Sequence, residues 1–329
     1  MRIEQARHVA RQWVRERGAD VRGFDGAFLT GSTLWAEPDA ELPPTSDVDV
    51  MLIADPPVHI GKFLYEGVLL EVSSIPGIGS THDVLSDYHL ASSLHLPCVL
   101  ADPSGRLGQT QRVVARDFAE RPWILARCTN AMDRVRAFIN GMDESASLPD
   151  QVTSWVFGTG VTTHVLLVAG LRNPTVRRRY ADVRDLLTAH GRLDFHEGLL
   201  DLLGCADLGV SRIERHLAAL EKAFDAAAAV RAPSYRFDSD ISELARPMTV
   251  DGTRQLIDQG LHREAVFWIV ATYARCLAKR QATGLSGYED GLLELLADLG
   301  AETFVDRRRR GDRVLAALPG VWQTAMALC

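Results

Sequence analysis

Along this 329-residue chain, the arrangement of apolar and polar residues changes near residue 120. The first part holds short apolar runs separated by Gly, Pro and Asp, which is typical of strands joined by turns. In the remainder, apolar residues recur at helical spacing over long runs. This contrast predicts an α/β domain over residues 1–120 and an all-α domain over residues 121–329, with no internal repeat.

The α/β part begins with an amphipathic helix, and strands follow it. Ile3, Ala6 and Trp13 lie on one face of a helix predicted over residues 2–18. Three prolines within residues 33–46 restrict that segment to one helical turn and then a loop. Strands are predicted around 27–29, 47–53, 62–65, 67–75 and 97–101, and further helices at 81–95 and 106–118.

The all-α part is predicted from amphipathic runs that alternate with Gly, Pro or Asp. Trp155, His164, Phe267, Trp268 and Tyr273 lie in these apolar helices and are expected to pack a core. The runs cover residues 123–141, 151–171, 175–190, 208–230, 259–282 and 302–317.

Three acidic side chains stand inside apolar runs of the α/β part. Asp47 and Asp49 are two residues apart, so on a strand both carboxylates point to one face while the valines point into the core. Glu71 is the single acid of the run Gly67–Val72. Three carboxylates that converge from neighbouring strands repel one another unless cations neutralise them. Mg²⁺, which prefers oxygen ligands, is the expected occupant.

The order of these residues resembles the signature of the DNA polymerase β-type nucleotidyltransferase superfamily. That signature is Gly-Ser, a short spacer, Asp-x-Asp and a third acid on a later strand, which here correspond to Gly31-Ser32, Asp47, Asp49 and Glu71. The chain looks most like the small-molecule branch, which includes aminoglycoside and lincosamide nucleotidyltransferases. The resemblance implies the nucleotidyltransferase fold, with a mixed sheet flanked by helices, and a helical acceptor-binding domain after it.

The resemblance also implies a reaction. A nucleoside monophosphate, with AMP from ATP as the leading expectation, moves to a hydroxyl of a small molecule, such as an aminoglycoside-like antibiotic or a natural product, and pyrophosphate leaves. Two Mg²⁺ ions can stabilise the attacking and leaving oxygens together. Asp47 and Asp49 are expected to ligate both ions. Glu71 is expected to hold the ion nearer the acceptor and to accept the hydroxyl proton.

Further residues are expected to bind the nucleotide. Gly31 lets the backbone approach phosphate, and Ser32 offers a hydroxyl and an N–H at a helix N-terminus. Lys62 is a candidate nucleotide contact, although a lone lysine beside a hairpin is also typical of a surface position. The spacer between Ser32 and Asp47 has 14 residues and no Arg or Lys, which departs from the family pattern.

Charge and cysteine content narrow the class of partner. Residues 1–120 contain 17 acidic and 10 basic side chains, whereas residues 121–329 contain 26 of each. An acidic half repels polyanions, which weighs against nucleic acid as a partner. Five scattered cysteines without CxxC, no signal-peptide core and no apolar stretch near the roughly 20 residues of a membrane span predict a cytoplasmic protein.

Other interpretations remain open at this point. A toxin-like transferase that modifies RNA or protein would use the same acids, and it requires arginine clusters on one face beside Asp49. A non-catalytic module with a vestigial site would bind nucleotide without turnover. The helical faces can also support a homodimer.

Two charged groups in the helical part have alternative roles. The run Arg177–Arg179 either reaches over a triphosphate or forms a solvated helix face, and Arg307–Arg310 is expected in a solvated, salt-bridged turn. The acids Asp238, Asp240 and Glu243 either line a cationic acceptor pocket or cap a following helix.

Overall fold

The computed structural model describes every residue from Met1 to Cys329. The chain divides into two compact units, Met1–Arg127 and Cys128–Cys329. The predicted boundary after residue 120 coincides with the start of helix α6 (Arg121–Asn140), and this helix continues from the first unit into the second.

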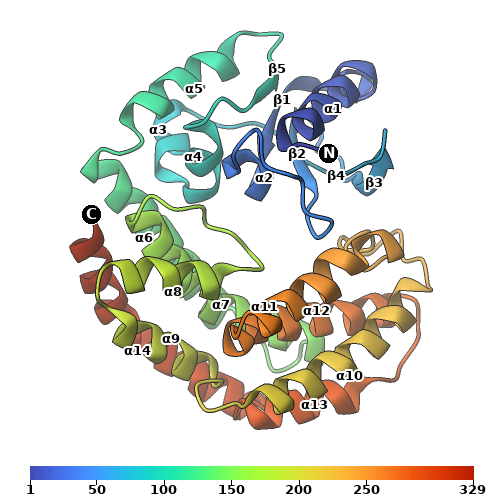
Figure 1. The fold of residues 1–329 in the computed structure, drawn as a ribbon, viewed down its shortest axis with the longest axis vertical. Coiled ribbons are helices and arrows are strands. Elements are labelled where there is room, and N and C mark those ends of the chain that lie inside the picture. The colour runs from blue at the N-terminus through green and yellow to red at the C-terminus, as the bar shows by residue number, and fades with distance from the viewer. The chain divides into compact units, whose positions relative to one another are not determined.

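The first unit is built on a five-stranded sheet in the order β3-β4-β2-β1-β5 (Figure 1). Strand β2 pairs in parallel with β4, whereas the other neighbouring pairs are antiparallel. The prediction of a mixed sheet in the N-terminal part, with helices around it, is therefore confirmed. The strands are β1 (Phe24–Thr30), β2 (Val48–Ala54), β3 (Gly61–Tyr65), β4 (Val68–Ile75) and β5 (Val99–Ala101).

Strand β2 lies in the middle of the sheet and shows the alternation expected for a strand with two different faces. Val48, Val50 and Leu52 are at most 1% exposed and form core. Asp49, between two of these residues, points to the opposite face because successive side chains alternate. The apolar residues that hold β2 in the sheet thus present Asp49 on the other side.

Five α-helices and the short 3-10 helix Gly18–Asp20 lie wholly within this unit, and the start of α6 belongs to it as well. Helix α1 (Ile3–Glu16) contacts β2, β4 and β5, and α2 (Gly31–Trp35) follows β1 directly. The helix predicted over 81–95 is two helices, because Asp87 has an extended backbone and its carboxylate accepts hydrogen bonds from the first N–H groups of the second helix. The remaining helices are α3 (Thr81–Ser86), α4 (Tyr88–Leu94) and α5 (Arg106–Asp117).

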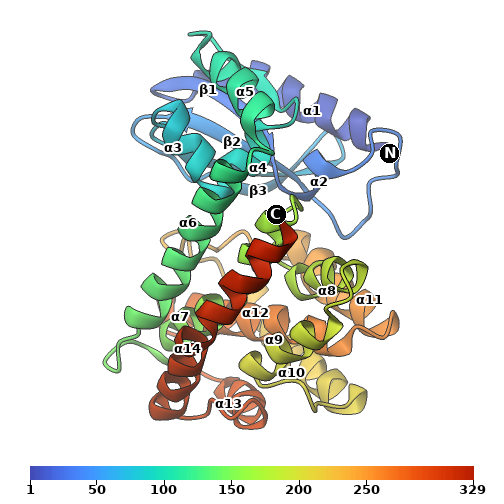
Figure 2. The same cartoon turned by 90° about the vertical axis from the view of Figure 1, so that its left-hand side faces the viewer.

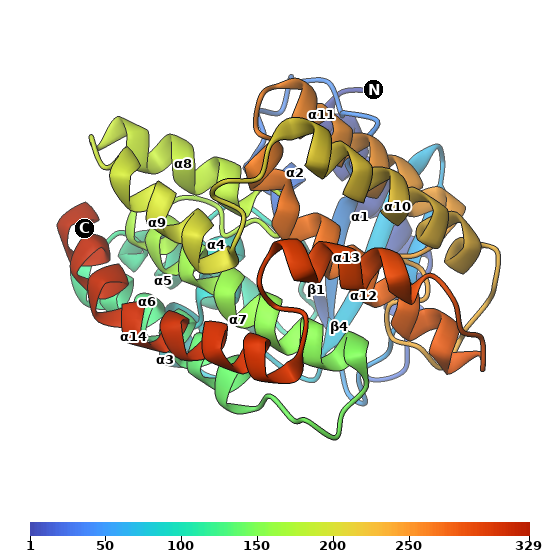
Figure 3. The same ribbon diagram turned by 90° about the horizontal axis from the view of Figure 1, so that it is seen from below.

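The second unit is helical, which confirms the mostly helical character predicted for the C-terminal part. Helix α7 (Leu148–Ala169) lies at its centre and contacts α8, α9, α12 and α14, and Figures 2 and 3 show α14 running along it. The other helices are α8 (Arg179–Ala189), α9 (Leu193–Leu203), α10 (Val210–Ala228), α11 (Gly252–Asp258), α12 (His262–Ala282), α13 (Glu289–Asp298) and α14 (Phe304–Leu328).

Helices α9, α11 and α13 were not among the predicted runs, and α14 extends beyond the predicted 302–317 through Pro319. The apolar stripe of α14 explains the extension. Leu318, Val321 and Ala325 are buried on both sides of the exposed Pro319. Packing of this stripe compensates for the hydrogen bond that proline removes from the helix.

Helix α7 is the one helix long and apolar enough to cross a membrane, which departs from the prediction that no stretch approaches that length. Within this unit, 83% of its most apolar window is buried. A central helix of a packed domain meets the same criteria of length and composition.

Candidate metal centre

The parallel pairing of β2 with β4 places Asp49 directly beside Glu71, its partner in the register. Asp47 lies one residue before β2 and projects to the same side as Asp49. Carboxylate oxygens of the three residues all lie within 4.8 Å of one another. The structure thus brings together the three acids predicted from the sequence. Asp49 lies on β2, Asp47 directly precedes β2, and Glu71 lies on the adjacent strand β4.

The side chain of Lys62 reaches into this group of acids. Lys62 lies on β3 opposite Glu71 in the antiparallel register. Its Nζ donates to Asp47 Oδ2 at 2.5 Å and also to Glu71 Oε2. Only 8% of the side chain is exposed, so the alternative of a surface lysine is wrong. A cation is therefore already part of the arrangement.

The remaining acid, Asp49, is strongly desolvated. Burial raises the pKa of Asp49 well above its usual value, and the charges of Asp47 and Glu71 raise it further, whereas the charge of Lys62 opposes the shift. The charged form of Asp49 is thus unfavourable without a nearby cation. A divalent ion at this position would favour the carboxylate and reverse the shift.

Gly31 lies against Asp49 at the junction of β1 and α2. Its φ of +72° is in the left-handed region that favours glycine. A Cβ atom at this position would lie 1.8 Å from Asp49 Oδ2, which is far inside van der Waals contact. The strand-to-helix turn can approach the carboxylate only because residue 31 has no side chain. Ser32, the next residue, is exposed in the first turn of α2.

The donor atoms of this cluster suit a hard cation. Asp47, Asp49 and Glu71 offer only carboxylate oxygens, which is the ligand type of Mg²⁺ and Mn²⁺. Oxygens of Asp47 and Glu71 already converge on the positive charge of the Lys62 ammonium. Strands β2 and β4 fix the backbone positions of Asp49 and Glu71, and Asp47 directly precedes β2, which favours a defined binding geometry. We therefore treat the three acids as a candidate metal centre.

One arginine of each run in the helical unit is buried and packs the core. Arg179 is 1% exposed, and its guanidinium lies over the rings of Phe157 and Phe267. Arg307 is buried and donates to Ala301 O, Glu302 O and Gln151 Oε1. The prediction of a solvated face is wrong for Arg179. The predicted turn at residues 307–310 is wrong because this run lies in α14 and Arg307 is buried, whereas the predicted ion pairs are present at Arg308–Asp312 and Arg309–Asp306, with Arg309 exposed.

Two of the three acids of the helical unit, Asp238 and Asp240, pair with basic side chains of α12, whereas Glu243 is exposed. Lys279 pairs with Asp238 at 2.8 Å, and Arg275 pairs with Asp240 at 3.2 Å. The capping interpretation also fails, since no side chain caps the short helix that begins at Glu243. These contacts anchor the segment before that helix to α12, which leaves little charge for a cationic acceptor.

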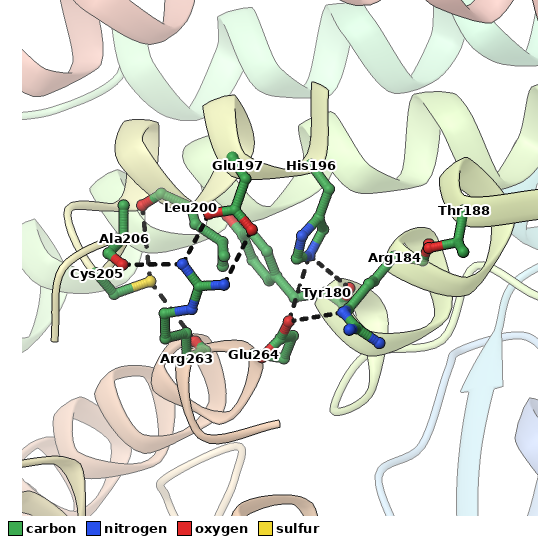
Figure 4. A network of polar contacts seen from close by, with 10 residues as sticks. All are labelled: Tyr180, Arg184, Thr188, His196, Glu197, Leu200, Cys205, Ala206, Arg263 and Glu264. Carbon is green, nitrogen blue, oxygen red and sulfur yellow. Dashed lines mark hydrogen bonds and ion pairs between the residues drawn. The ribbon is translucent and has the colours of Figure 1, made fainter. Parts of the chain in front are cut away.

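A second group of titratable side chains lies inside the helical unit, around His196 of α9 (Figure 4). His196 Nε2 lies 3.2 Å from Tyr180 O and 3.7 Å from Glu264 Oε1, and Arg184 Nε lies 3.6 Å from the same Glu264 oxygen. Burial lowers the pKa of His196 to about 4 and raises the pKa of Glu264. His196 is fully buried, so this cluster ties α8, α9 and α12 together from the inside.

This cluster predicts acid sensitivity. The His196 pKa falls from 6.5 to about 4 on folding, so between these pH values the unfolded chain binds a proton that the folded chain does not. Stability contributed by neutral His196 is therefore lost as the pH falls from 6.5 to 4, by about 3 kcal/mol. Glu264 acts in the opposite direction, because its raised pKa favours the folded state at lower pH.

Urea unfolding of wild type and His196→Gln between pH 4 and 7 measures the effect. The variant is expected to lose part of the pH dependence, whereas His8→Gln, at an exposed position of α1, should keep it. Parallel stability curves for wild type and His196→Gln would contradict the assignment.

No protein-family model matches the chain, and no match is found among curated proteins or among solved structures. The geometry of the site is therefore the basis for a function.

Proposed function

We propose that this chain is a metal-dependent nucleotidyltransferase. It moves a nucleoside monophosphate, AMP from ATP, onto a hydroxyl of a small molecule and releases pyrophosphate. The observation that carries the proposal is the convergence of three acids at the adjacent parallel strands β2 and β4: carboxylate oxygens of Asp47, Asp49 and Glu71 lie within 4.8 Å of one another. Gly31 lies so close to Asp49 that a Cβ atom would not fit between them. The nucleotidyltransferase fold of the first unit is part of the same proposal, and the mixed sheet supports it.

Each residue of the site has a part in this reaction. Asp47 and Asp49 would hold the divalent ions, and Glu71 would hold the ion nearer the acceptor. When bound, Mg²⁺ supplies positive charge at the attacking and leaving oxygens of phosphoryl transfer. The side chain of Glu71 is 28% exposed and therefore accessible to the acceptor. Glu71 accepts the proton of the acceptor hydroxyl while the hydroxyl oxygen forms a bond to the α-phosphorus. The bond from that phosphorus to the pyrophosphate oxygen breaks, so atoms and charge balance.

The remaining residues position the nucleotide. Gly31 and Ser32 offer backbone and hydroxyl groups next to Asp49, where phosphate oxygens would lie. Lys62 is the cation nearest the acids and can supply positive charge that the spacer of residues 33–46 lacks. An aminoglycoside-like antibiotic or another natural product is the proposed acceptor class, and a cytoplasmic location fits the reduced cysteines.

The proposal predicts pyrophosphate release that requires both a divalent metal and an acceptor. Purified chain is incubated with each of the four nucleoside triphosphates, Mg²⁺ and a panel of aminoglycosides and lincosamides. Release with one acceptor class, abolished by EDTA and restored by excess Mg²⁺, is the expected result. Absence of release with every acceptor, together with absence of metal-dependent nucleotide binding, would overturn the proposal.

A further inference from the structure

Lys62 occupies the position that a divalent ion between Asp47 and Glu71 would need. The ammonium contacts one oxygen of each acid and is almost completely buried. A Mg²⁺ ion would require these oxygens at about 2.1 Å. Two cations cannot both be in contact with the same pair of oxygens at low cost, because they would repel each other at that separation. The ammonium must therefore move before an ion can bind both acids.

Lys62 lies on β3 of the β3–β4 hairpin, and the hairpin fixes its backbone position. Strands β3 and β4 are joined by Glu66 and Gly67, both with positive φ, as in a two-residue turn of type I′. This turn sets Lys62 directly opposite Glu71, on the same face of the sheet. The register therefore fixes the backbone of Lys62 opposite Glu71, and from there its side chain contacts both acids.

The charges of the cluster indicate what can displace the lysine. With all three acids ionised, as metal binding requires, the carboxylates and the ammonium sum to −2, which a single divalent ion would neutralise and a second would reverse. A triphosphate brings negative charge together with its metal, so a metal–nucleotide complex pairs both with the acids and with the released ammonium. A free metal ion offers the ammonium no new partner.

We propose that Lys62 is an internal counter-ion of the acids that keeps free divalent ions out of the centre. A metal–nucleotide complex displaces the Lys62 ammonium from the acids. This inference rests on the proposed function, because it assumes that the three acids bind metal. Lys62 thereby acts as a positioning residue. It stabilises the acids before loading, and it makes occupancy of the centre depend on nucleotide.

Metal titration without turnover tests the inference. Mn²⁺ is titrated by calorimetry into wild type, Lys62→Met, Lys222→Met and Asp49→Asn, with and without a non-hydrolysable ATP analogue. Lys62→Met is expected to bind free Mn²⁺ on the order of tenfold more tightly than wild type, because a competing cation is gone. Lys222, an exposed lysine of α10, is the matched control and should leave the affinity unchanged. With the analogue, the difference between wild type and Lys62→Met should shrink.

The outcomes separate the inference from the function on which it rests. Equal Mn²⁺ affinity of wild type and Lys62→Met, with binding lost in Asp49→Asn, would overturn the role of Lys62 and leave the metal centre standing. No Mn²⁺ binding by any variant, with or without the analogue, would overturn both. Lys62→Gln serves as a second variant. If both variants unfold without metal, refolding on addition of Mn²⁺ supports the inference, and failure to refold contradicts it.

Discussion

Asp49→Asn is expected to reduce nucleotide transfer by about 10³-fold or more and to leave the chain folded. The substitution keeps the shape of the side chain but removes the charge that would hold a divalent ion. Loss of transition-state stabilisation of about 4 kcal/mol corresponds to this factor. The measurement is the rate of acceptor-dependent pyrophosphate release at saturating nucleotide.

The same substitution is expected to stabilise the metal-free protein. Burial and two neighbouring carboxylates raise the pKa of Asp49, so folding disfavours its charged form. A neutral amide removes this penalty at neutral pH. Lys62 still pairs with Asp47 and Glu71, since neither contact involves Asp49. Loss of activity with a melting temperature equal to or above that of wild type is therefore the expected pair of results.

Asp55→Asn provides the matched control for this experiment. Asp55 follows the other end of β2 and is exposed, so its replacement should change neither transfer nor metal binding. If Asp49→Asn transferred nucleotide as fast as Asp55→Asn, the three acids would not be the metal centre. If Asp49→Asn unfolded the chain, its role would be structural.

The convergence of the three acids could be predicted because it depends on a short-range rule. Alternation along a strand places Asp47 and Asp49 on one face, and a second strand with one acid suggests a neighbour. The parallel pairing of β2 with β4 could not be read in this way, because it depends on packing across the whole sheet. The register of that pairing is what brings Asp49 and Glu71 side by side.

The contact of Lys62 with the acids was missed, although the sequence holds a signal for it. Lys62 and Glu71 are equidistant from Glu66-Gly67, so a two-residue hairpin turn at this position pairs them across the strands. Interpreting the dipeptide as a turn would have predicted a cross-strand ion pair.

The arginine runs show where local sequence reasoning fails. Charged runs are usually solvated, and nothing in Arg177–Arg179 distinguishes a buried arginine from an exposed one. Arg179 is buried because Phe157 of α7 and Phe267 of α12, distant in sequence, meet its guanidinium. Contacts of this kind depend on tertiary packing.

Gly31→Ala is expected to impair the centre without unfolding the chain. The new Cβ would lie 1.8 Å from Asp49 Oδ2, so the carboxylate must move away by more than 1 Å to reach van der Waals contact. Displacement of a reacting group by about 1 Å can cost about 100-fold in rate. We expect a similar loss of transfer together with weaker Mn²⁺ binding. The free energy of unfolding should fall by about 1–2 kcal/mol, because alanine is strained at positive φ.

Gly105→Ala is the matched control for Gly31→Ala. It introduces the same backbone strain without displacing Asp49. Gly105, before α5, has a φ of +74°, close to the +72° of Gly31, but a Cβ there would meet nothing within 4 Å. Both variants should therefore lose similar stability, and only Gly31→Ala should lose transfer and metal affinity. Equal losses of activity would attribute the effect to strain and would remove Gly31 from the site. Full activity in Gly31→Ala would mean that nucleotide transfer does not depend on the position of the Asp49 carboxylate beside residue 31.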